Sequence, residues 1–424
     1  MDFFTFKNDE AFCEEVPLAK IAELVGTPVY VYSKSTLDHH CRKLAEAFAP
    51  YATLPCYAVK ANSNLTLLKM IFSHGFGADV VSLGELERAV KAGVDPHKVM
   101  YSGVGKAKHE IERALNLDIM AFNVESLAEL AMIAALARSS GQSAAISIRV
   151  NPNIDAKTNP KIATGLHSTK FGIAENDLPD VLELIKKNKE ELRLCGVSCH
   201  IGSQILDLTP LKQAAERMVN IAQELIKQGY EIQFIDMGGG VGIKYLEHQN
   251  APDFKEYASV FSRMSCLKGM RLVIEPGRIL VGNCGILLTK IILEKKTLQR
   301  RFVVVDAAMN DFIRPTLYGA EHEILPVRLG GVAEGSSRAS WTQADVVGPI
   351  CETGDFIGIA KSLPSTEVTR SGELLFVRGC GAYGFSMASN YNSRPRTAEV
   401  LVDGNHLITI RKRETLEDLW RLEI

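Results

Sequence analysis

The stretch Leu54–Asn62, which reads LPCYAVKAN, decides how the rest of the chain is interpreted. Its apolar residues form a short continuous run, as in a strand buried on both faces, and the run ends at one cation, Lys60. In a parallel barrel the carboxyl ends of the strands carry the chemistry, and a lysine there can form a Schiff base if its surroundings lower its pKa from about 10.4. Taken alone, the stretch favours an ordinary solvated lysine, so the remaining sequence must decide.

Short apolar runs alternate with amphipathic segments along the chain after this stretch. This alternation is typical of βα units that build a parallel sheet. Eight strand-helix pairs over about 215 residues predict an α/β protein with a (β/α)8 TIM-type barrel. The predicted strands are Cys56–Val59, Ala78–Val81, Lys98–Tyr101, Ile119–Asn123, Ala145–Val150, Leu194–His200, Phe234–Met237 and Arg271–Glu275.

A second, mostly β domain is predicted beyond the barrel. After Arg278 the sequence changes to strands separated by turn residues, and Asp403-Gly404 is a strong hairpin signal. Near the start, Pro28 opens a predicted strand, and Ser35 is the predicted N-cap of a helix that ends at Phe48. The expected domains are residues 1–34, a segment that packs with the β domain, 35–278, the cofactor-binding barrel, and 279–424, the β-rich domain.

The composition excludes several classes of partner. The chain has 424 residues, 46% of them hydrophobic and 23% charged, and a formal net charge of -2. Such a balance provides no basic field for nucleic acid or an anionic membrane. The start, MDFFTFKNDE, has acids where a signal peptide has bases, and no apolar run approaches the roughly 20 residues that span a bilayer. Nine cysteines without metal-ligand spacing indicate reduced thiols, so a cytoplasmic enzyme without a metal is expected.

Two glycine-containing motifs follow the seventh and eighth predicted strands. Loops at these places commonly hold phosphate in (β/α)8 barrels. Gly238–Gly240 can direct backbone N–H groups at an anion, and Arg278 adds a charge-assisted bond. A tight turn could explain one glycine, but three in a row favour phosphate binding. Together with Lys60 and Glu275, a phosphate site suggests pyridoxal 5'-phosphate, with Glu275 facing the pyridine nitrogen.

These roles have ordinary alternatives. Glu275 alone could be an ion-pair partner of Arg278. His200 could stack on the cofactor while Ser203 binds an anion, but a histidine at a strand end is usually a structural hydrogen-bonding group. Only the combination of motifs raises the functional interpretation above these alternatives.

The combined motifs resemble those of the diaminopimelate decarboxylase family, whose members are fold-type III pyridoxal phosphate enzymes. The resemblance implies decarboxylation of meso-2,6-diaminopimelate to L-lysine and carbon dioxide, the last step of lysine biosynthesis. It covers most of the chain, in order, and rests on YAVKAN (57–62), STKFG (168–172), CHIGSQ (199–204), GGG (238–240), EPGR (275–278), CETGD (351–355) and GAYGF (381–385).

The resemblance also implies a role for each matching residue. Lys60 carries the cofactor, His200 stacks on its ring, and Glu275 meets the ring nitrogen. Cys351 protonates the substrate carbon from a second subunit, so a homodimer with active sites shared across the interface is implied. The other cofactor contacts are Ser203, Gly239, Gly240, Gly277, Arg278 and Tyr383. The other substrate contacts are Arg278, Arg314, Tyr318, Glu352 and Tyr383.

Several alternatives stay open at this point. Arg314 and Tyr318 could lie in a surface turn, and Cys351 could be a small buried hydrophobic residue. Ornithine or arginine decarboxylase is the nearest rival, but the Cys351-Glu352 pair favours diaminopimelate, because the diamine decarboxylases have a similar motif that carries Cys-Asp at this place. Alanine racemase is less compatible with Glu275, and a catalytically silent scaffold is less compatible with Lys60 and Cys351. Asn159 departs from the histidine found in many family members.

Overall fold

The protein is described by a computed structural model that covers residues 2–156, 158–162, 164–165, 169–262, 269–329, 341–364 and 370–424. The chain divides into two compact units. One unit comprises residues 41–243 and 250–279 and holds the barrel. The other comprises residues 1–40, 244–249 and 280–424 and is rich in β-structure. Each unit is described in turn.

The barrel unit contains a closed ring of eight parallel strands. Their order is β9-β11-β12-β13-β5-β6-β7-β8, and β8 pairs with β9 to complete the ring. This confirms the predicted (β/α)8 fold, and each observed strand overlaps its predicted range. The strands are β5 (Thr53–Ala58), β6 (Gly77–Val80), β7 (Val99–Tyr101), β8 (Ala121–Val124), β9 (Ala144–Asn151), β11 (Leu192–Ser198), β12 (Phe234–Asp236) and β13 (Arg271–Ile274). A two-residue strand, β10 (Ile173–Ala174), pairs with the end of β9.

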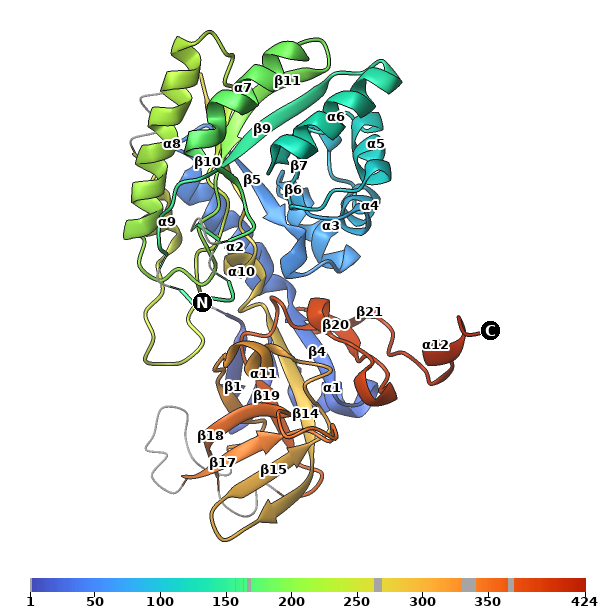
Figure 1. Cartoon of the computed structure of the whole chain (residues 1–424). Coiled ribbons are helices and arrows are strands. Elements are labelled where there is room, and N and C mark those ends of the chain that lie inside the picture. The colour runs from blue at the N-terminus through green and yellow to red at the C-terminus, as the bar shows by residue number, and fades with distance from the viewer. Residues whose placement is uncertain are drawn as a thin grey trace. The chain divides into compact units, whose positions relative to one another are not determined.

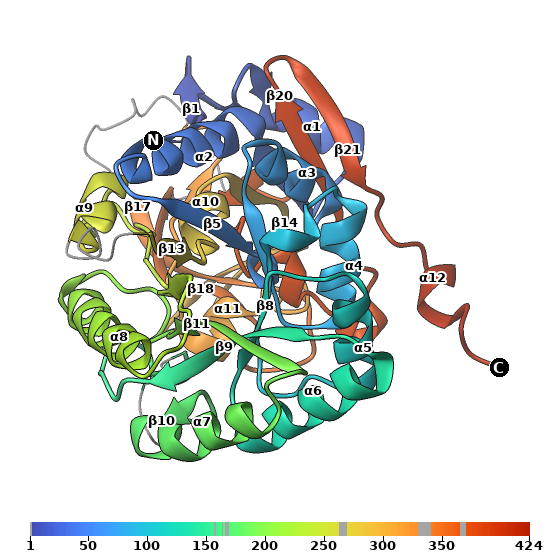
Figure 2. The ribbon, with the colours of Figure 1, turned by 90° about the horizontal axis from the view of Figure 1, so that it is seen from above.

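Helices surround these strands, as Figure 2 shows from above. Their starts follow local chemistry: the side chains of Ser82 and Ser126 cap α4 and α6 by accepting from the backbone N–H groups of Glu85 and Glu129. The helices are α2 (Lys34–Phe48), α3 (Leu65–Ser73), α4 (Leu83–Lys91), α5 (Lys108–Asn116), α6 (Leu127–Ser140), α7 (Leu178–Lys187), α8 (Thr209–Lys227), α9 (Phe254–Ser259) and α10 (Arg278–Val281).

The centre of the barrel is filled by side chains from the strands. One buried cluster draws residues from seven of the eight strands, all except β6, so the interior is a packed core and not a channel. Gly196 on β11 allows this packing, because a Cβ there would lie 2.4 Å from the ring of Phe234. The cluster comprises Leu54, Cys56, Met100, Ala121, Ala145, Cys195, Phe234 and Val273.

The β-rich unit is built around one long strand, β14. It pairs antiparallel with β15, β19 and β4, so the strand opened by Pro28 belongs to this sheet. Asp403 and His406 face each other across the predicted hairpin turn, where Gly404 adopts a φ of 61°. The main strands are β4 (Val29–Ser33), β14 (Gly285–Lys296), β15 (Arg301–Val305), β16 (Ile324–Pro326), β17 (Trp341–Val347), β18 (Phe356–Pro364), β19 (Leu374–Val377), β20 (Ala398–Asp403) and β21 (His406–Arg411) (Figure 1).

Smaller elements complete this unit. The first residues form a sheet of β1 (Phe4–Lys7), β2 (Glu10–Cys13) and β3 (Val16–Pro17), followed by α1 (Leu18–Val25), and later come α11 (Arg314–Tyr318) and α12 (Glu417–Trp420). The predicted N-cap at Ser35 is wrong. Ser33 accepts from the N–H of Thr36, so the helix begins earlier, at Lys34. Within the described residues, none of the helices has both the length and the apolar character needed to cross a bilayer.

Candidate active site

Lys60 lies just beyond β5, in a short 3-10 turn (Val59–Ala61) at the carboxyl end of the barrel. Its ammonium group contacts Asp79 of the neighbouring strand β6 at 2.6 Å. The Asp79 side chain is fully buried, whereas the Lys60 side chain is 33% exposed. A buried carboxylate therefore holds the amine in place while part of the lysine remains accessible.

Two carboxyl groups lie close together on the adjacent strands β12 and β13. Asp236 ends β12, Glu275 follows β13, and their side chains hydrogen-bond to each other. The Nδ2 of Asn123 donates to Asp236 at 3.1 Å and to Glu275 at 3.5 Å. Burial raises the pKa of Asp236 to about 6, and burial followed by repulsion from Asp236 raises the pKa of Glu275 well above its ordinary value. The pair consequently favours retaining a proton or meeting a cation.

Lys60 and Glu275 belong to the same group of charges. The positive charge of Lys60 opposes the rise in the Glu275 pKa, and β5 and β13 pair directly. Gly277 packs on the turn that carries Lys60, because a Cβ at Gly277 would lie 3.1 Å from the Cβ atoms of Ala58 and Ala61. The two motifs chosen from sequence are therefore neighbours at one end of the barrel.

The glycine run after β12 is explained by local packing. Gly238 and Gly240 adopt positive φ angles of 62° and 98°. A Cβ on Gly239 would lie 2.0 Å from the carbonyl oxygen of Glu275, and one on Gly240 would lie 2.0 Å from that of Gly202. Each of the three positions requires glycine on steric grounds, so the run by itself gives no support for phosphate, and phosphate contact stays a prediction.

His200 follows β11 and has a defined hydrogen-bonding state. Its Nδ1 accepts from the backbone N–H of Gly239 at 3.2 Å, so a neutral ring carries its proton on Nε2. Burial, together with the nearby cations Lys60 and Arg149, lowers the pKa of His200 well below its ordinary value. The imidazole is therefore neutral, which suits stacking on a ring and does not suit donation of a proton.

Arg278 and Ser203 contact each other within the barrel unit. Arg278 begins α10, is buried, and its Nη2 donates to the Ser203 hydroxyl at 2.9 Å. The structure thus groups one set of predicted residues at the carboxyl end of the barrel strands: Lys60, His200, Ser203, Gly239, Gly240, Glu275, Gly277 and Arg278.

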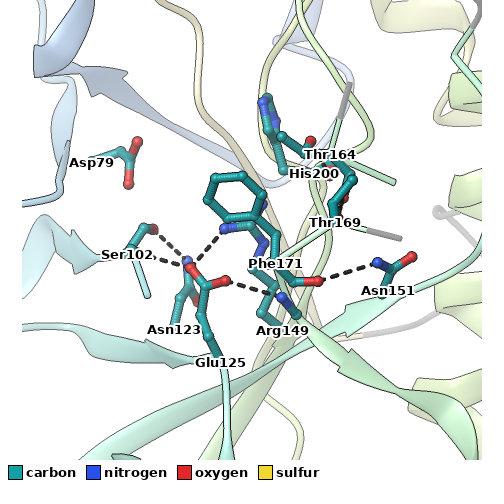
Figure 3. A network of polar contacts seen from close by, with 12 residues as sticks. Asp79, Ser102, Asn123, Glu125, Arg149, Asn151, Thr164, Thr169, Phe171 and His200 are labelled. Atoms are coloured by element: carbon teal, nitrogen blue, oxygen red, sulfur yellow. Dashed lines mark hydrogen bonds and ion pairs between the residues drawn. The ribbon is translucent and has the colours of Figure 1, made fainter. Parts of the chain in front are cut away.

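A buried ion pair supports this end of the barrel. Arg149 of β9 donates to Glu125 at 2.7 Å, and its guanidinium carbon lies 4.9 Å from the centroid of the Phe171 ring (Figure 3). The same carboxylate accepts from the backbone N–H groups of Gly103 and Gly172. The STKFG motif (168–172) is thereby tied to the barrel through its last two residues, while its first residue, Ser168, lies outside the described part of the chain.

The remaining predicted residues lie in the β-rich unit. Arg314 begins α11, is only 5% exposed, and has its guanidinium carbon 6.0 Å from the centroid of the Tyr318 ring and 5.2 Å from that of Tyr245. A surface turn is therefore not the environment of Arg314. Tyr383 is half-buried and has a φ of 56°, which is uncommon for a residue with a side chain.

Cys351 and Glu352 lie in an exposed loop. Every other described cysteine is buried, so the alternative of a small buried hydrophobic residue fails for Cys351. The buried Asp355 shapes the loop by accepting from the backbone N–H groups of Met309 and Ile350. The Cys351 N–H donates to Asn392, and the Glu352 carboxylate hydrogen-bonds to Tyr391.

Sequence reasoning gave no role to several residues of this site. Each is a polar or charged residue in or just after an otherwise apolar strand, and this placement is the signal that could have identified it. These residues are Asp79, Asn123, Glu125, Arg149 and Asp236.

Comparison with known proteins identifies the family of the chain. Residues 34–282 match the family described as "Pyridoxal-dependent decarboxylase, pyridoxal binding domain". A diaminopimelate decarboxylase of Neisseria meningitidis serogroup A is 47% identical over 415 residues, which are 97% of this chain and 98% of the relative.

Solved structures give the same result. A diaminopimelate decarboxylase (I148L mutant) of Helicobacter pylori, complexed with L-lysine, has a TM-score of 0.89 and 42% identity, covering 96% of this chain and 99% of that one. A diaminopimelate decarboxylase from M. jannaschi has a TM-score of 0.92 and 34% identity, and the match covers 100% of this chain and 98% of that one. The chain therefore belongs to the diaminopimelate decarboxylase family, among the pyridoxal-dependent decarboxylases.

Proposed function

We propose that this protein decarboxylates meso-2,6-diaminopimelate to L-lysine with pyridoxal 5'-phosphate as its cofactor. The observation that carries the proposal is the placement of a lysine amine and a buried carboxyl pair on neighbouring strands at one barrel end. Full-length identity to enzymes named for this activity supports the choice of substrate.

The residues at the barrel end fit this cofactor. Asp236 and Glu275 are buried side by side and have raised pKa values, so they are matched to a cationic ring nitrogen. Within the described residues, the buried Oδ1 atoms of Asp79 and Asn123 lack a protein hydrogen-bond partner, which leaves them able to accept from a bound group. Pyridoxal phosphate, when bound, supplies an aldehyde and a ring that accepts the electron pair left on the substrate carbon when carbon dioxide departs.

The barrel residues hold and orient this group. Lys60 would hold it through its amine, which Asp79 positions, and Glu275 would keep a proton at the ring nitrogen while Asp236 and Asn123 fix the Glu275 carboxyl group. His200, being neutral, would cover one ring face. The phosphate would be bound by Ser203, Gly239, Gly240, Gly277 and Arg278.

The second set of residues would bind the substrate. Arg278, Arg314 and Tyr318 would bind the carboxylate that the product retains, Glu352 would bind the distal ammonium group, and Tyr383 would contact cofactor and substrate. A guanidinium suits this task because it engages a carboxylate through two parallel hydrogen bonds. Ornithine, which has no distal carboxylate, would leave a buried guanidinium unmatched, so discrimination against it should be large.

A homodimer explains the exposure of Cys351. We place Cys351 and Glu352 in the active site of the neighbouring subunit, where the thiol would return a proton to the substrate carbon after carbon dioxide leaves. We further propose that the enzyme acts in the cytoplasm and that residues 35–278 form the cofactor-binding domain, with 1–34 and 279–424 forming the β-rich domain.

The decisive experiment measures carbon dioxide release from meso-diaminopimelate and from ornithine, side by side, with the purified protein. We expect release from diaminopimelate only. Faster release from ornithine would refute the assigned substrate, and release from neither would refute the assigned reaction.

A mixing experiment tests the sharing of active sites. The Lys60→Ala and Cys351→Ala variants are each expected to be nearly inactive, and Cys351→Ala is expected to keep the bound cofactor. If each site uses Cys351 from the other subunit, mixed dimers contain one intact site and recover part of the activity. Absence of any recovery after subunit exchange would show that each site is built within one chain.

A further inference from the structure

His322 of the β-rich unit has no role in the function proposed above. It is fully buried, and its Nε2 lies 3.3 Å from the Nε of Arg314. Its Nδ1 lies 2.9 Å from the carbonyl oxygen of Arg378. The two partners define the state of the ring: the Arg314 Nε–H can only donate, so Nε2 must accept, and Nδ1–H donates to the carbonyl oxygen.

Two aromatic rings pack against the ring of His322. Tyr245 lies at 4.6 Å and Phe312 at 4.8 Å between ring centroids, both in edge-to-face geometry. Gly379 leaves room for this arrangement, since a Cβ there would lie 2.9 Å from the Tyr245 ring, and its φ of 69° suits glycine. Both the position and the tautomer of His322 are therefore fixed by its surroundings.

Arg314 is fixed as a consequence. The Tyr245 ring packs against its guanidinium and His322 accepts from its Nε. A guanidinium can bind a carboxylate through two parallel hydrogen bonds in either of two modes. One mode uses Nε and one terminal nitrogen, and the other uses both terminal nitrogens. With Nε held by His322, binding through Nη1 and Nη2 is the geometry that remains for a carboxylate.

We propose that His322 is a positioning residue for Arg314, which it orients so that the two terminal nitrogens bind the carboxylate retained by the product. This inference rests on the proposed function, in which Arg314 binds that carboxylate. His322 touches neither substrate nor cofactor in this assignment and acts through Arg314 alone. It thereby contributes to selection of substrates that carry a distal carboxylate.

The test compares two competitive ligands of the holoenzyme, L-lysine and cadaverine, which differ only by the carboxylate. In His322→Phe, which keeps an aromatic ring but lacks the acceptor, L-lysine binding should weaken by about 10-fold or more, the usual loss for a hydrogen bond to a charged group. Cadaverine binding should change by less than about 2-fold, because it does not use Arg314. The KM for diaminopimelate should rise in parallel with the dissociation constant of L-lysine. The kcat should change little.

Two amide variants separate positioning from packing. In His322→Gln the longer amide can accept from the Arg314 Nε, so the preference for L-lysine over cadaverine should return. In His322→Asn the amide can still donate to the Arg378 carbonyl but is too short to reach Arg314, so the preference should stay low. Phe312→Leu is the matched control, because it loosens the same pocket while keeping both hydrogen bonds; it should lower thermal stability and leave the preference unchanged.

The outcomes distinguish this inference from the proposed function. If the wild-type protein neither decarboxylates diaminopimelate nor binds L-lysine, the proposed function is refuted. If the wild-type protein does both, and His322→Asn keeps the preference for L-lysine or loses both ligands equally, the positioning role alone is refuted. The Asn and Gln variants keep this test valid even if His322→Phe does not fold.

Discussion

Two buried acidic groups at the end of the barrel differ in how their charge is balanced. Glu125 meets the guanidinium of Arg149 at 2.7 Å and accepts from two backbone N–H groups, with only 2% of its side chain exposed. Glu275 is buried to a similar extent, but its partners are another carboxyl group, Asp236, and the amide of Asn123. Glu125 is therefore in contact with a cation, whereas Glu275 is in contact with a second acid.

This difference separates support from function. A buried ion pair whose hydrogen bonds are satisfied is stable as it stands, and removal of one partner is costly. A buried pair of acids has an excess of negative charge, which is relieved by a proton or by a cationic ligand. Such unbalanced groups are typical of functional sites, and here the pyridinium of the cofactor would balance the charge.

The largest expected effect comes from two lysines that differ in the same way, one in the proposed site and one in a buried ion pair. Lys60→Ala should abolish the visible absorbance of the bound cofactor and lower kcat by about 10⁴-fold or more, as when the nucleophile of a covalent mechanism is removed. Lys106, which is fully buried and paired with Glu129 at 2.6 Å, is the matched control. Lys106→Ala should lower stability and keep the absorbance. Persistent colour in the purified Lys60→Ala protein would contradict the proposed role.

Removal of the cation from the balanced pair should act on stability. Arg149→Met leaves Glu125 buried without its partner, and we expect the free energy of unfolding to fall by about 3–5 kcal/mol in urea denaturation. The double variant with Glu125→Gln should recover part of this loss, because no charge is then left uncompensated. A loss below about 1 kcal/mol in the single variant would show that the pair is not structurally important.

Neutralisation of the unbalanced pair should act on activity instead. Glu275→Gln removes the carboxylate that keeps the ring nitrogen protonated, and kcat should fall by roughly 10²-fold, about 2.7 kcal/mol of transition-state stabilisation. The free energy of unfolding of the cofactor-free protein at pH 8 should not decrease. If Glu275→Gln were destabilised as strongly as Arg149→Met, the distinction between the two clusters would be lost.

The smallest effect concerns pH. Because the pKa of Asp236 is raised to about 6, the folded cofactor-free protein binds a proton more tightly than the unfolded chain, so this group stabilises the fold at low pH. That stabilisation is lost as the pH rises from about 4 through about 6. The Asp236→Asn side chain cannot ionise, so the free energy of unfolding of the variant should fall less than that of the wild type between pH 4 and pH 8. The expected difference between the two decreases is roughly 1–3 kcal/mol, at about 1.4 kcal/mol per pKa unit.

The measurement is the unfolding free energy of the two cofactor-free proteins at each pH. Buried acids that Asp236 does not influence, such as Glu85 and Asp311 with pKa values raised to about 7, are present in both proteins and cancel in the comparison. Glu275 does not cancel, because Asp236→Asn removes the repulsion that raises its pKa, which reduces the pH dependence of the variant further. Parallel pH dependences for the wild type and Asp236→Asn would show that Asp236 does not titrate in this range.

The fold and part of the site could be predicted from local sequence. Apolar runs reveal buried strands, and Lys60 and Glu275 stand out because each charge ends such a run. The partners of these residues could not be predicted in the same way. Asn123 meets Asp236 and Glu275 across 113 and 152 positions of sequence, and no local pattern reports such a contact. The need for glycine in the run after β12 could not be predicted from local sequence either, because the backbone crowding that requires it depends on register, and phosphate contact by this run stays a prediction.

The sequence by itself determined the alternation of strands and helices, the closed barrel that follows from it, and the family to which the motifs point. Only the tertiary structure decided that Glu275 shares its surroundings with Asp236, that Asp79 holds Lys60, and that His322 accepts from Arg314. The physical reason is that burial follows from the local period of apolar residues, whereas charge balance and hydrogen bonding depend on which strands and loops become neighbours after folding.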